Sequence, residues 1–290
     1  MRLLGAELRK LNRPLMWALV VFAAAFCVML AIGAANNARL DLHDALREGG
    51  ARAVPNRLAA ATVANQLSPG AAGAEAAGMM ASMPGAFLAA MLAGGHVGGE
   101  WTGRTLKNVL AHNGYRGRVL AAKAASTWLA LVAVVVVCWA VLAASGTLIC
   151  RANGLPHATE PFSTGLSHSG AQLARALLVL AFFAVVGLLA AVLTRGTVGT
   201  IAGSIAAVVA LLALGTLPTV GKWTPATWVE AWMGFTSGDR TLSTLPDNFW
   251  SRFTASGAIP GHLFGLAGMA GAVVVPAVVA WQVFRRADVV

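Results

Sequence analysis

Six stretches of the chain are apolar enough and long enough to cross a membrane as helices. They cover residues 14–35, 78–98, 124–149, 173–194, 197–217 and 262–284. A helix needs about 20 predominantly apolar residues to cross roughly 30 Å of hydrocarbon. The pattern therefore predicts one all-α integral membrane domain, residues 1–290, with six transmembrane helices.

The first thirteen residues have a different pattern, in which leucines and charged residues recur at helical spacing. The leucines Leu3, Leu4, Leu8 and Leu11 share one side, and Arg2, Arg9, Lys10 and Arg13 lie largely on the other. We expect residues 1–13 to form an amphipathic helix that lies on the inner leaflet.

Two kinds of residue recur every four positions in the second apolar run. Small residues form a small-residue seam, made of Ala86, Ala90, Gly94 and Gly98, which would let another helix approach closely. Large residues form a methionine stripe, made of Met79, Met83, Phe87 and Met91, about a quarter-turn away. The stripe either contacts varied apolar ligands or faces lipid and core. A kink is expected at Pro84.

An aromatic loop lies between the last two runs. It spans residues 218–261 and holds four of the nine tryptophans: Trp223, Trp228, Trp232 and Trp250. Trp228 and Trp232 are one helical turn apart, so we expect a short helix that dips into the outer leaflet at the membrane interface.

Composition agrees with a membrane protein, because 58% of residues are hydrophobic and only 11% are charged. The formal charge of +10 is explained by the bias of Lys and Arg toward cytoplasmic segments. Without a basic stripe with interleaved aromatic residues, nucleic acid is not an expected partner. Membrane lipid is the expected surrounding, and the predicted location is the cell membrane, with multiple spans and both termini cytoplasmic.

The segment 99–123 is the most basic long connection between two runs, and it is assigned to the cytoplasm. Its Lys and Arg residues, Arg104, Lys107, Arg116, Arg118 and Lys123, face one acid, Glu100. Thr102 can cap a helix in which Trp101, Thr105, Val109 and His112 recur at helical spacing. A short helix along the membrane is therefore expected. The alternative is an ordinary basic loop held by anionic lipid headgroups.

The order Glu100, Gly103, Thr105, Lys107, Arg118 and Lys123 resembles the loop between the second and third helices of ABC type-2 exporter permeases. In that family the loop forms the coupling helix, which docks into the ATPase subunit. The family has Gly directly before Thr, whereas here Arg104 lies between Gly103 and Thr105. The resemblance assigns coupling to nine residues: Glu100, Thr102, Gly103, Arg104, Thr105, Lys107, Arg116, Arg118 and Lys123.

The resemblance also implies partners, a transport path and a partly re-entrant aromatic loop between helices 5 and 6. Such permeases act as two halves, identical or sister chains, with two P-loop ATPase subunits that bind ATP and Mg. The second and fifth helices line the cavity between the halves. The residues implied for the substrate pathway are Met79, Met83, Phe87, Met91, Ile201, Ile205 and Val208.

Catalytic motifs are absent from the sequence, which contains no phosphate-binding P-loop and no nucleophile elbow. ATP hydrolysis is therefore expected in a separate subunit, with no catalytic residue, cofactor or metal site in this chain. No predicted span carries an Asp, Glu, Lys or Arg near its middle, which disfavours a proton- or sodium-coupled carrier. The predicted function is export of an amphiphilic substrate, such as a drug, peptide antibiotic, lipid or glycan.

Two alternatives are a non-transporting membrane scaffold and a membrane-embedded enzyme. A cluster of polar residues within the membrane would favour the enzyme, and none is evident from the sequence.

Overall fold

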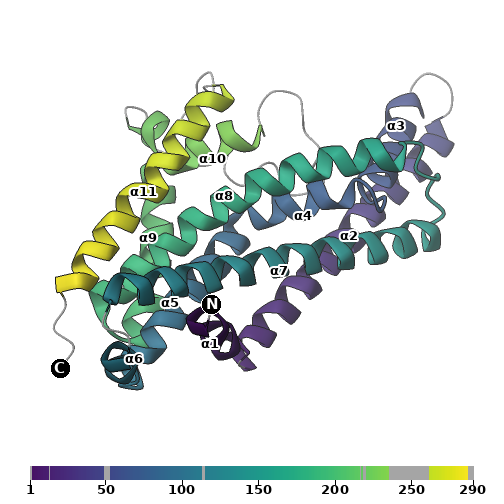
Figure 1. The fold of residues 1–290 in the computed structure, drawn as a ribbon. Coiled ribbons are helices and arrows are strands. Elements are labelled where there is room, and N and C mark those ends of the chain that lie inside the picture. Colours follow the sequence, from purple (N-terminus) through teal and green to yellow (C-terminus); the bar gives the residue numbers. More distant parts are fainter. Residues whose placement is uncertain are drawn as a thin grey trace.

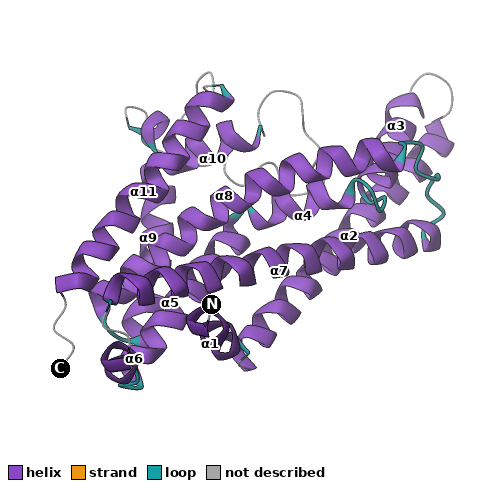
Figure 2. Ribbon diagram, viewed as in Figure 1, coloured by secondary structure: helices purple, strands orange, loops and turns teal. Residues whose placement is uncertain are grey.

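The computed structural model describes residues 2–12, 14–48, 53–112, 115–215, 217, 220–234 and 261–286. Their regular structure is entirely helical (Figure 2). Five helices are each long and apolar enough to span a membrane: α2 (Pro14–Glu48), α7 (Arg116–Ala152), α8 (Phe162–Thr194), α9 (Thr197–Gly215) and α11 (His262–Arg286). The chain is thus an all-α protein of membrane-embedded type.

The second predicted span differs from expectation, because it is two helices rather than one kinked at Pro84. α4 (Ala72–Met80) and α5 (Met83–Thr102) meet at a 63° bend, and together they supply a sixth span if they are counted as one. Pro84 lies in the first turn of α5, where its missing N–H has no helical partner to lose. The break therefore falls before the proline, at Ala81 and Ser82.

Three helices are longer than a bilayer requires. α2, α7 and α8 contain 35, 37 and 33 residues, which is roughly 50 Å each at 1.5 Å per residue. At the end of the molecule away from α1, α3 (Ala53–Gln66) packs against α2 (Figure 1). Most of the described residues between 36 and 77, which separate the first two predicted spans, are therefore helical.

The small-residue seam of α5 packs against α8 and α9, as the four-residue spacing predicted. A Cβ on Gly187 of α8 would lie 2.1 Å from the Ala90 carbonyl oxygen, and a Cβ on Gly94 would lie 2.4 Å from Thr200 Cγ2 of α9. Only glycine fits at either position. The backbones of these helices are therefore in direct contact, which is the packing that small residues allow in membranes.

Shorter helices occupy the ends of the bundle. α1 (Arg2–Leu11) and α6 (Leu106–His112) lie at one end, beside the N-terminus of α7 (Figure 1). The helix predicted around Trp228 and Trp232 is confirmed as α10 (Pro225–Met233), which follows the turn η2 (Gly221–Trp223) and packs on α11. Residues 235–260 lie outside the described residues, so the re-entrant course of this loop stays a prediction.

Candidate functional site

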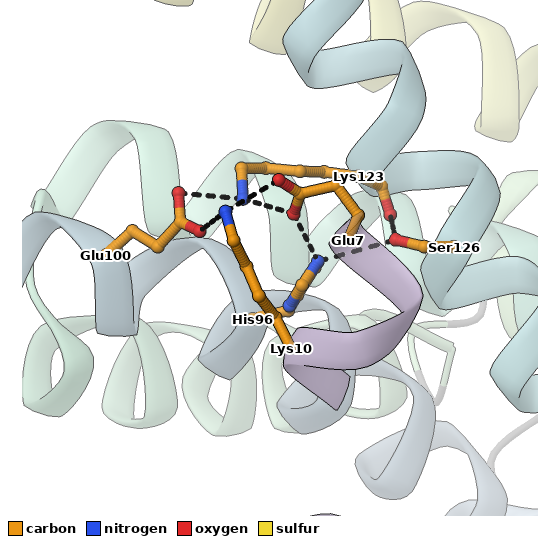
Figure 3. Close-up of polar contacts among 6 residues, drawn as sticks. All are labelled: Glu7, Lys10, His96, Glu100, Lys123 and Ser126. Carbon is orange, nitrogen blue, oxygen red and sulfur yellow. Dashed lines mark hydrogen bonds and ion pairs between the residues drawn. The ribbon is translucent and has the colours of Figure 1, made fainter. Parts of the chain in front are cut away.

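Four charged side chains from three helices close a ring inside the end of the bundle that carries α1. Glu7 and Lys10 come from α1, Glu100 from α5 and Lys123 from α7 (Figure 3). Lys10 Nζ lies 2.7 Å from both Glu7 Oε1 and Glu100 Oε1. Lys123 Nζ lies 2.7 Å from Glu7 Oε2 and 2.8 Å from Glu100 Oε2. The contact with Glu100 is an ion pair whose angles do not fit a hydrogen bond. Each carboxylate thus bridges both ammonium groups, and the charge ring is neutral.

Helical spacing explains part of this arrangement, because α1 and α5 each place two polar side chains on one face. Glu7 and Lys10 are three residues apart on α1, and His96 and Glu100 are four apart on α5. Residues at these separations are neighbours on a helix surface. Glu7, Glu100 and Lys123 are fully or almost fully buried, and Lys10 is partly exposed. The three helices therefore meet through charge rather than through an apolar face.

His96 and Ser126 extend the ring but do not form a catalytic relay. His96 Nε2 lies 3.1 Å from Glu7 Oε2 and 3.4 Å from Ser126 Oγ, so both partners approach the same ring nitrogen (Figure 3). A Ser-His-carboxylate triad needs the serine and the carboxylate on opposite nitrogens. Ser126 instead donates to the Lys123 carbonyl at 2.9 Å. The group holds the three helices together.

The two charged residues of α1 have shifted pKa values. Burial raises the pKa of Glu7, but hydrogen bonds from His96, Lys10 and Lys123 outweigh burial and hold it well below its ordinary value. Burial lowers the pKa of Lys10, whereas its bonds to Glu100 and Glu7 raise it, and the net direction is upward. Both groups are therefore charged at neutral pH.

The buried face of α1 differs from the one expected. Glu7 points inward and is fully buried, whereas Leu8 is 39% exposed. Glu7 thus lies on the same side of α1 as the leucines, and the rest of the chain leaves Leu8 uncovered. The hydrophobic pattern could not show this, because the partners of Glu7 lie about a hundred residues further along the chain.

The residues predicted for coupling divide into two groups in the structure. Glu100 and Lys123 are buried in the charge ring within this chain, so their side chains are not at the surface. Arg104, Lys107 and Arg118 are exposed, as are Thr102, Gly103 and Thr105, and Arg116 is partly exposed. Arg104 and Lys107, which lie between the end of α5 and the start of α7, and Arg118 of α7 contribute to the basic surface at this end of the bundle.

α6 is held from several sides. Its first residue, Leu106, is buried in a small cluster with Leu120, Val192 and Phe284. Thr102, which was expected to cap this helix, belongs to the last turn of α5, and its Oγ1 accepts a hydrogen bond of 2.9 Å from the backbone N–H of Thr197 at the start of α9. α6 is thus shorter than predicted and packs through Leu106 on α7, α8 and α11, whereas the hydrogen bond to α9 comes from the end of α5.

Arg104 forms the turn between α5 and α6. It adopts a φ of +53°, the left-handed conformation that commonly ends a helix and that glycine usually occupies. The Thr105 N–H then bonds back to the Glu100 carbonyl oxygen at 3.1 Å. Arg104, the residue that departs from the family order, therefore occupies the left-handed position of this turn.

The residues predicted for the pathway are not all on one surface. Met83, Phe87 and Met91 are half-exposed along α5, and Ile201 and Ile205 are at least partly exposed on α9. Met79 belongs to α4 and is buried beside Cys27, and Val208 is also buried. The methionine stripe is interrupted because the helix breaks between Met79 and Met83, so Met79 faces the core.

Glu7, Lys10, His96 and Ser126 were not predicted as site residues. One signal was present, since Glu7 is the sole acid among the first thirteen residues. The sequence did not indicate the buried polar cluster that these residues form at the end of the bundle carrying α1. Within the described residues, no group of three or more His, Cys, Asp or Glu side chains could hold a metal ion, and the three cysteines are free thiols.

The fold and this site define a helical membrane-type protein whose N-terminal helix is held by buried ion pairs. No protein-family model matches the chain, and no curated protein matches it significantly.

Proposed function

We propose that the chain is the membrane-spanning permease subunit of an ATP-driven ABC exporter of the type-2 class. It moves an amphiphilic substrate, such as a drug, peptide antibiotic, lipid or glycan, out of the cell. A separate P-loop ATPase, present in two copies, binds ATP and Mg, and a second permease half completes the path. The chain resides in the cell membrane with both termini in the cytoplasm.

The observation that carries the proposal is the short basic helix α6, fixed to the spanning helices at both of its ends. Lys107 and Arg104 are exposed there, whereas Leu106 is anchored among α7, α8 and α11. A force applied to this surface would reach α9 through Thr102 and α1 through the charge ring. Such an arrangement suits the transmission of motion from a cytoplasmic subunit.

The path in this proposal runs along the half-exposed face of α5. Met83, Phe87 and Met91 are left partly uncovered by the rest of the chain. Unbranched, polarizable methionine side chains adapt to ligands of varied shape. Ile201 and Ile205 of α9 extend the same role, whereas the buried Met79 and Val208 support the helices behind it.

The proposal is tested by purifying the chain from a membrane that also contains the P-loop ATPase encoded beside it. We expect the two to copurify and the substrate to stimulate ATP hydrolysis. Charge reversal at Arg104 and Lys107 should reduce that stimulation, while reversal at Arg39, an exposed arginine of α2 far from α6, should not. Unchanged transport in the double variant Arg104→Glu, Lys107→Glu would contradict the coupling role.

The alternative of a membrane-embedded enzyme has one observation in its favour, the buried polar cluster itself. However, both carboxylates of the charge ring are neutralised by ammonium groups. The geometry at His96 Nε2 also prevents a relay from Ser126 to Glu7. The permease proposal is therefore preferred over the enzyme.

A further inference from the structure

A large apolar groove lies between α8, α9 and α11, beside α10. Its volume is about 760 Å³, within the range of roughly 300–1,000 Å³ typical of ligand sites. Its wall includes Phe182, Val186 and Leu189 of α8, Ala210 of α9, Val275 of α11 and Trp228 of α10. Three of the four helices are apolar enough to span a membrane. The groove is therefore open to hydrocarbon rather than to water.

A positive charge lies above this groove on the same face of α8. Arg175 precedes Phe182 by seven residues, and Val186 and Leu189 follow at helical spacing, so the four side chains form one line. Seven residues correspond to roughly 10 Å along the helix axis. Each headgroup layer is roughly 5–8 Å thick, so a side chain this far below Arg175 reaches hydrocarbon when Arg175 lies among the headgroups.

Two tryptophans of α10 connect the charge to the groove. The Arg175 guanidinium carbon lies 5.9 Å from the centre of the Trp232 ring, and Trp232 Nε1 donates to the Arg175 carbonyl oxygen at 3.0 Å. Trp228, one turn earlier, lines the groove and packs over Gly268 of α11. Tryptophan is enriched where the headgroup region meets the hydrocarbon. The site thus presents a positive charge, then an aromatic wall and then an apolar groove, which suits the phosphate headgroup and acyl chain of a phospholipid.

We propose that this groove binds one anionic phospholipid, with the headgroup phosphate at Arg175 and an acyl chain along Phe182, Val186 and Leu189. The His262 ring and the Arg175 guanidinium both lie beside Gly234, so His262 offers a second polar contact. The lining supplies no charged side chain below Arg175, so a hydrocarbon chain is favoured over a polar ligand. This site lies away from the charge ring and does not depend on the exporter proposal.

The test measures tryptophan quenching by brominated lipids in nanodiscs that each hold one copy of the full chain. Discs of phosphatidylcholine receive either phosphatidylglycerol or phosphatidylcholine with a dibrominated acyl chain, at equal mole fraction. The contribution of Trp228 is the difference between the wild type and Trp228→Phe. We expect brominated phosphatidylglycerol to quench this contribution about fivefold more strongly, the preference expected from one basic residue near an anionic headgroup.

Three variants separate the two parts of the site. Arg175→Ala should remove the preference for phosphatidylglycerol, and Arg175→Lys should retain most of it. Gly271→Leu should reduce quenching by both lipids, because Gly271 faces open space at the groove and leucine fits there without a clash. Gly33→Leu is the matched control, since Gly33 of α2 also faces open space but lies elsewhere, and it should behave as the wild type.

Three results would overturn the proposal. Equal quenching by the two brominated lipids in the wild type, or an Arg175→Ala variant that keeps the preference, would show that no anionic headgroup is bound there. The absence of Trp228 quenching by either lipid would show that protein, rather than lipid, fills the groove. Thermal unfolding of each variant verifies that it is folded before it is compared.

Discussion

The two sides of α5 differ in what they contact and in how much change each can accept. Two faces of α5 are covered: the small-residue seam contacts α8 and α9, and on a different face His96 and Glu100 contact α1 and α7. The remaining side carries Met83, Phe87 and Met91, which the rest of the chain leaves half-exposed. The covered side depends on exact size and charge, whereas the uncovered side needs only an apolar surface.

This difference shows that one helix can serve two purposes when the residues for each purpose lie on different faces. Residues four apart stay on one side, so the requirements of packing do not constrain the stripe a quarter-turn away. The effect of a substitution on stability should therefore depend more on which side of α5 it lies than on the type of residue introduced. The following predictions test that dependence, starting with the largest effect.

The largest loss is expected from Lys123→Met, which removes a buried ammonium group and leaves Glu7 and Glu100 with excess negative charge. Removal of one partner from a buried ion pair typically costs about 3–5 kcal/mol. The free energy of unfolding in mild detergent measures the effect. Lys107→Met, at an exposed position of α6, is the control and should be nearly neutral. The double variant Lys123→Met, Glu100→Gln should recover part of the loss, and a purely additive result would contradict the charge ring.

A smaller loss is expected from Gly94→Leu, on the covered side. A Cβ there would lie 2.4 Å from Thr200 Cγ2 and 3.1 Å from the Gly187 carbonyl oxygen, and overpacking of this kind costs about 1–3 kcal/mol or more. Gly95→Leu is the matched control, because no atom lies within 4 Å of a Cβ at that adjacent position. Equal unfolding temperatures for the two variants would mean that the two sides of α5 do not differ.

A pH dependence of known sign is expected from Glu7. Its pKa is lower in the folded protein than the ordinary 4.5, so the ionised carboxylate contributes its full stabilisation above that pH and loses it as the pH falls below. Acidification from about pH 5 to about pH 3 should therefore destabilise the wild type more than Glu7→Gln. Asp44→Asn, at an exposed position of α2, should retain the wild-type dependence. The unfolding midpoint in detergent measures this, and identical slopes in the wild type and Glu7→Gln would contradict the prediction.

The smallest change in stability is expected on the uncovered side, from Met83→Ala and Phe87→Ala. Both side chains are partly buried against the core, so a loss of about 1 kcal/mol, the typical value for a point substitution, is expected. The range of substrates exported should change if the α5 part of the stripe lines the path. Transport is compared at equal expression, with Gly95→Leu as a second change on this side. Unaltered specificity and rate would assign the stripe to contact with lipid alone.

Much of the fold could be predicted from the periodicity of the sequence. Each apolar run forms helix, the end of α8 at Thr194 agrees with its predicted boundary, and the spacing of Trp228 and Trp232 correctly indicated α10. These features depend on neighbours within a few residues. The break between α4 and α5 was predicted at the wrong place, because the position of a proline within its helix decides whether it kinks the helix or begins it.

The candidate site was less predictable. The pattern indicated which residues share a side of α1 and α5, but not which helices those sides meet. Glu100 and Lys123 were noticed as charged residues of a surface loop, whereas burial makes them internal partners of Glu7 and Lys10. Only the arrangement of the helices in space brings Glu100 and Lys123 next to residues about a hundred positions earlier in the chain.

The charge ring also sets an order for the assembly of the protein during synthesis. Glu7 and Lys123 are 116 residues apart, which corresponds to roughly 6–23 s of translation at 5–20 residues per second. Until Lys123 leaves the ribosome, one side of the ring is absent, and the burial of Glu7 would leave its negative charge incompletely balanced. We therefore expect α1 to dock fully only after the start of α7, which carries Lys123, has been synthesised.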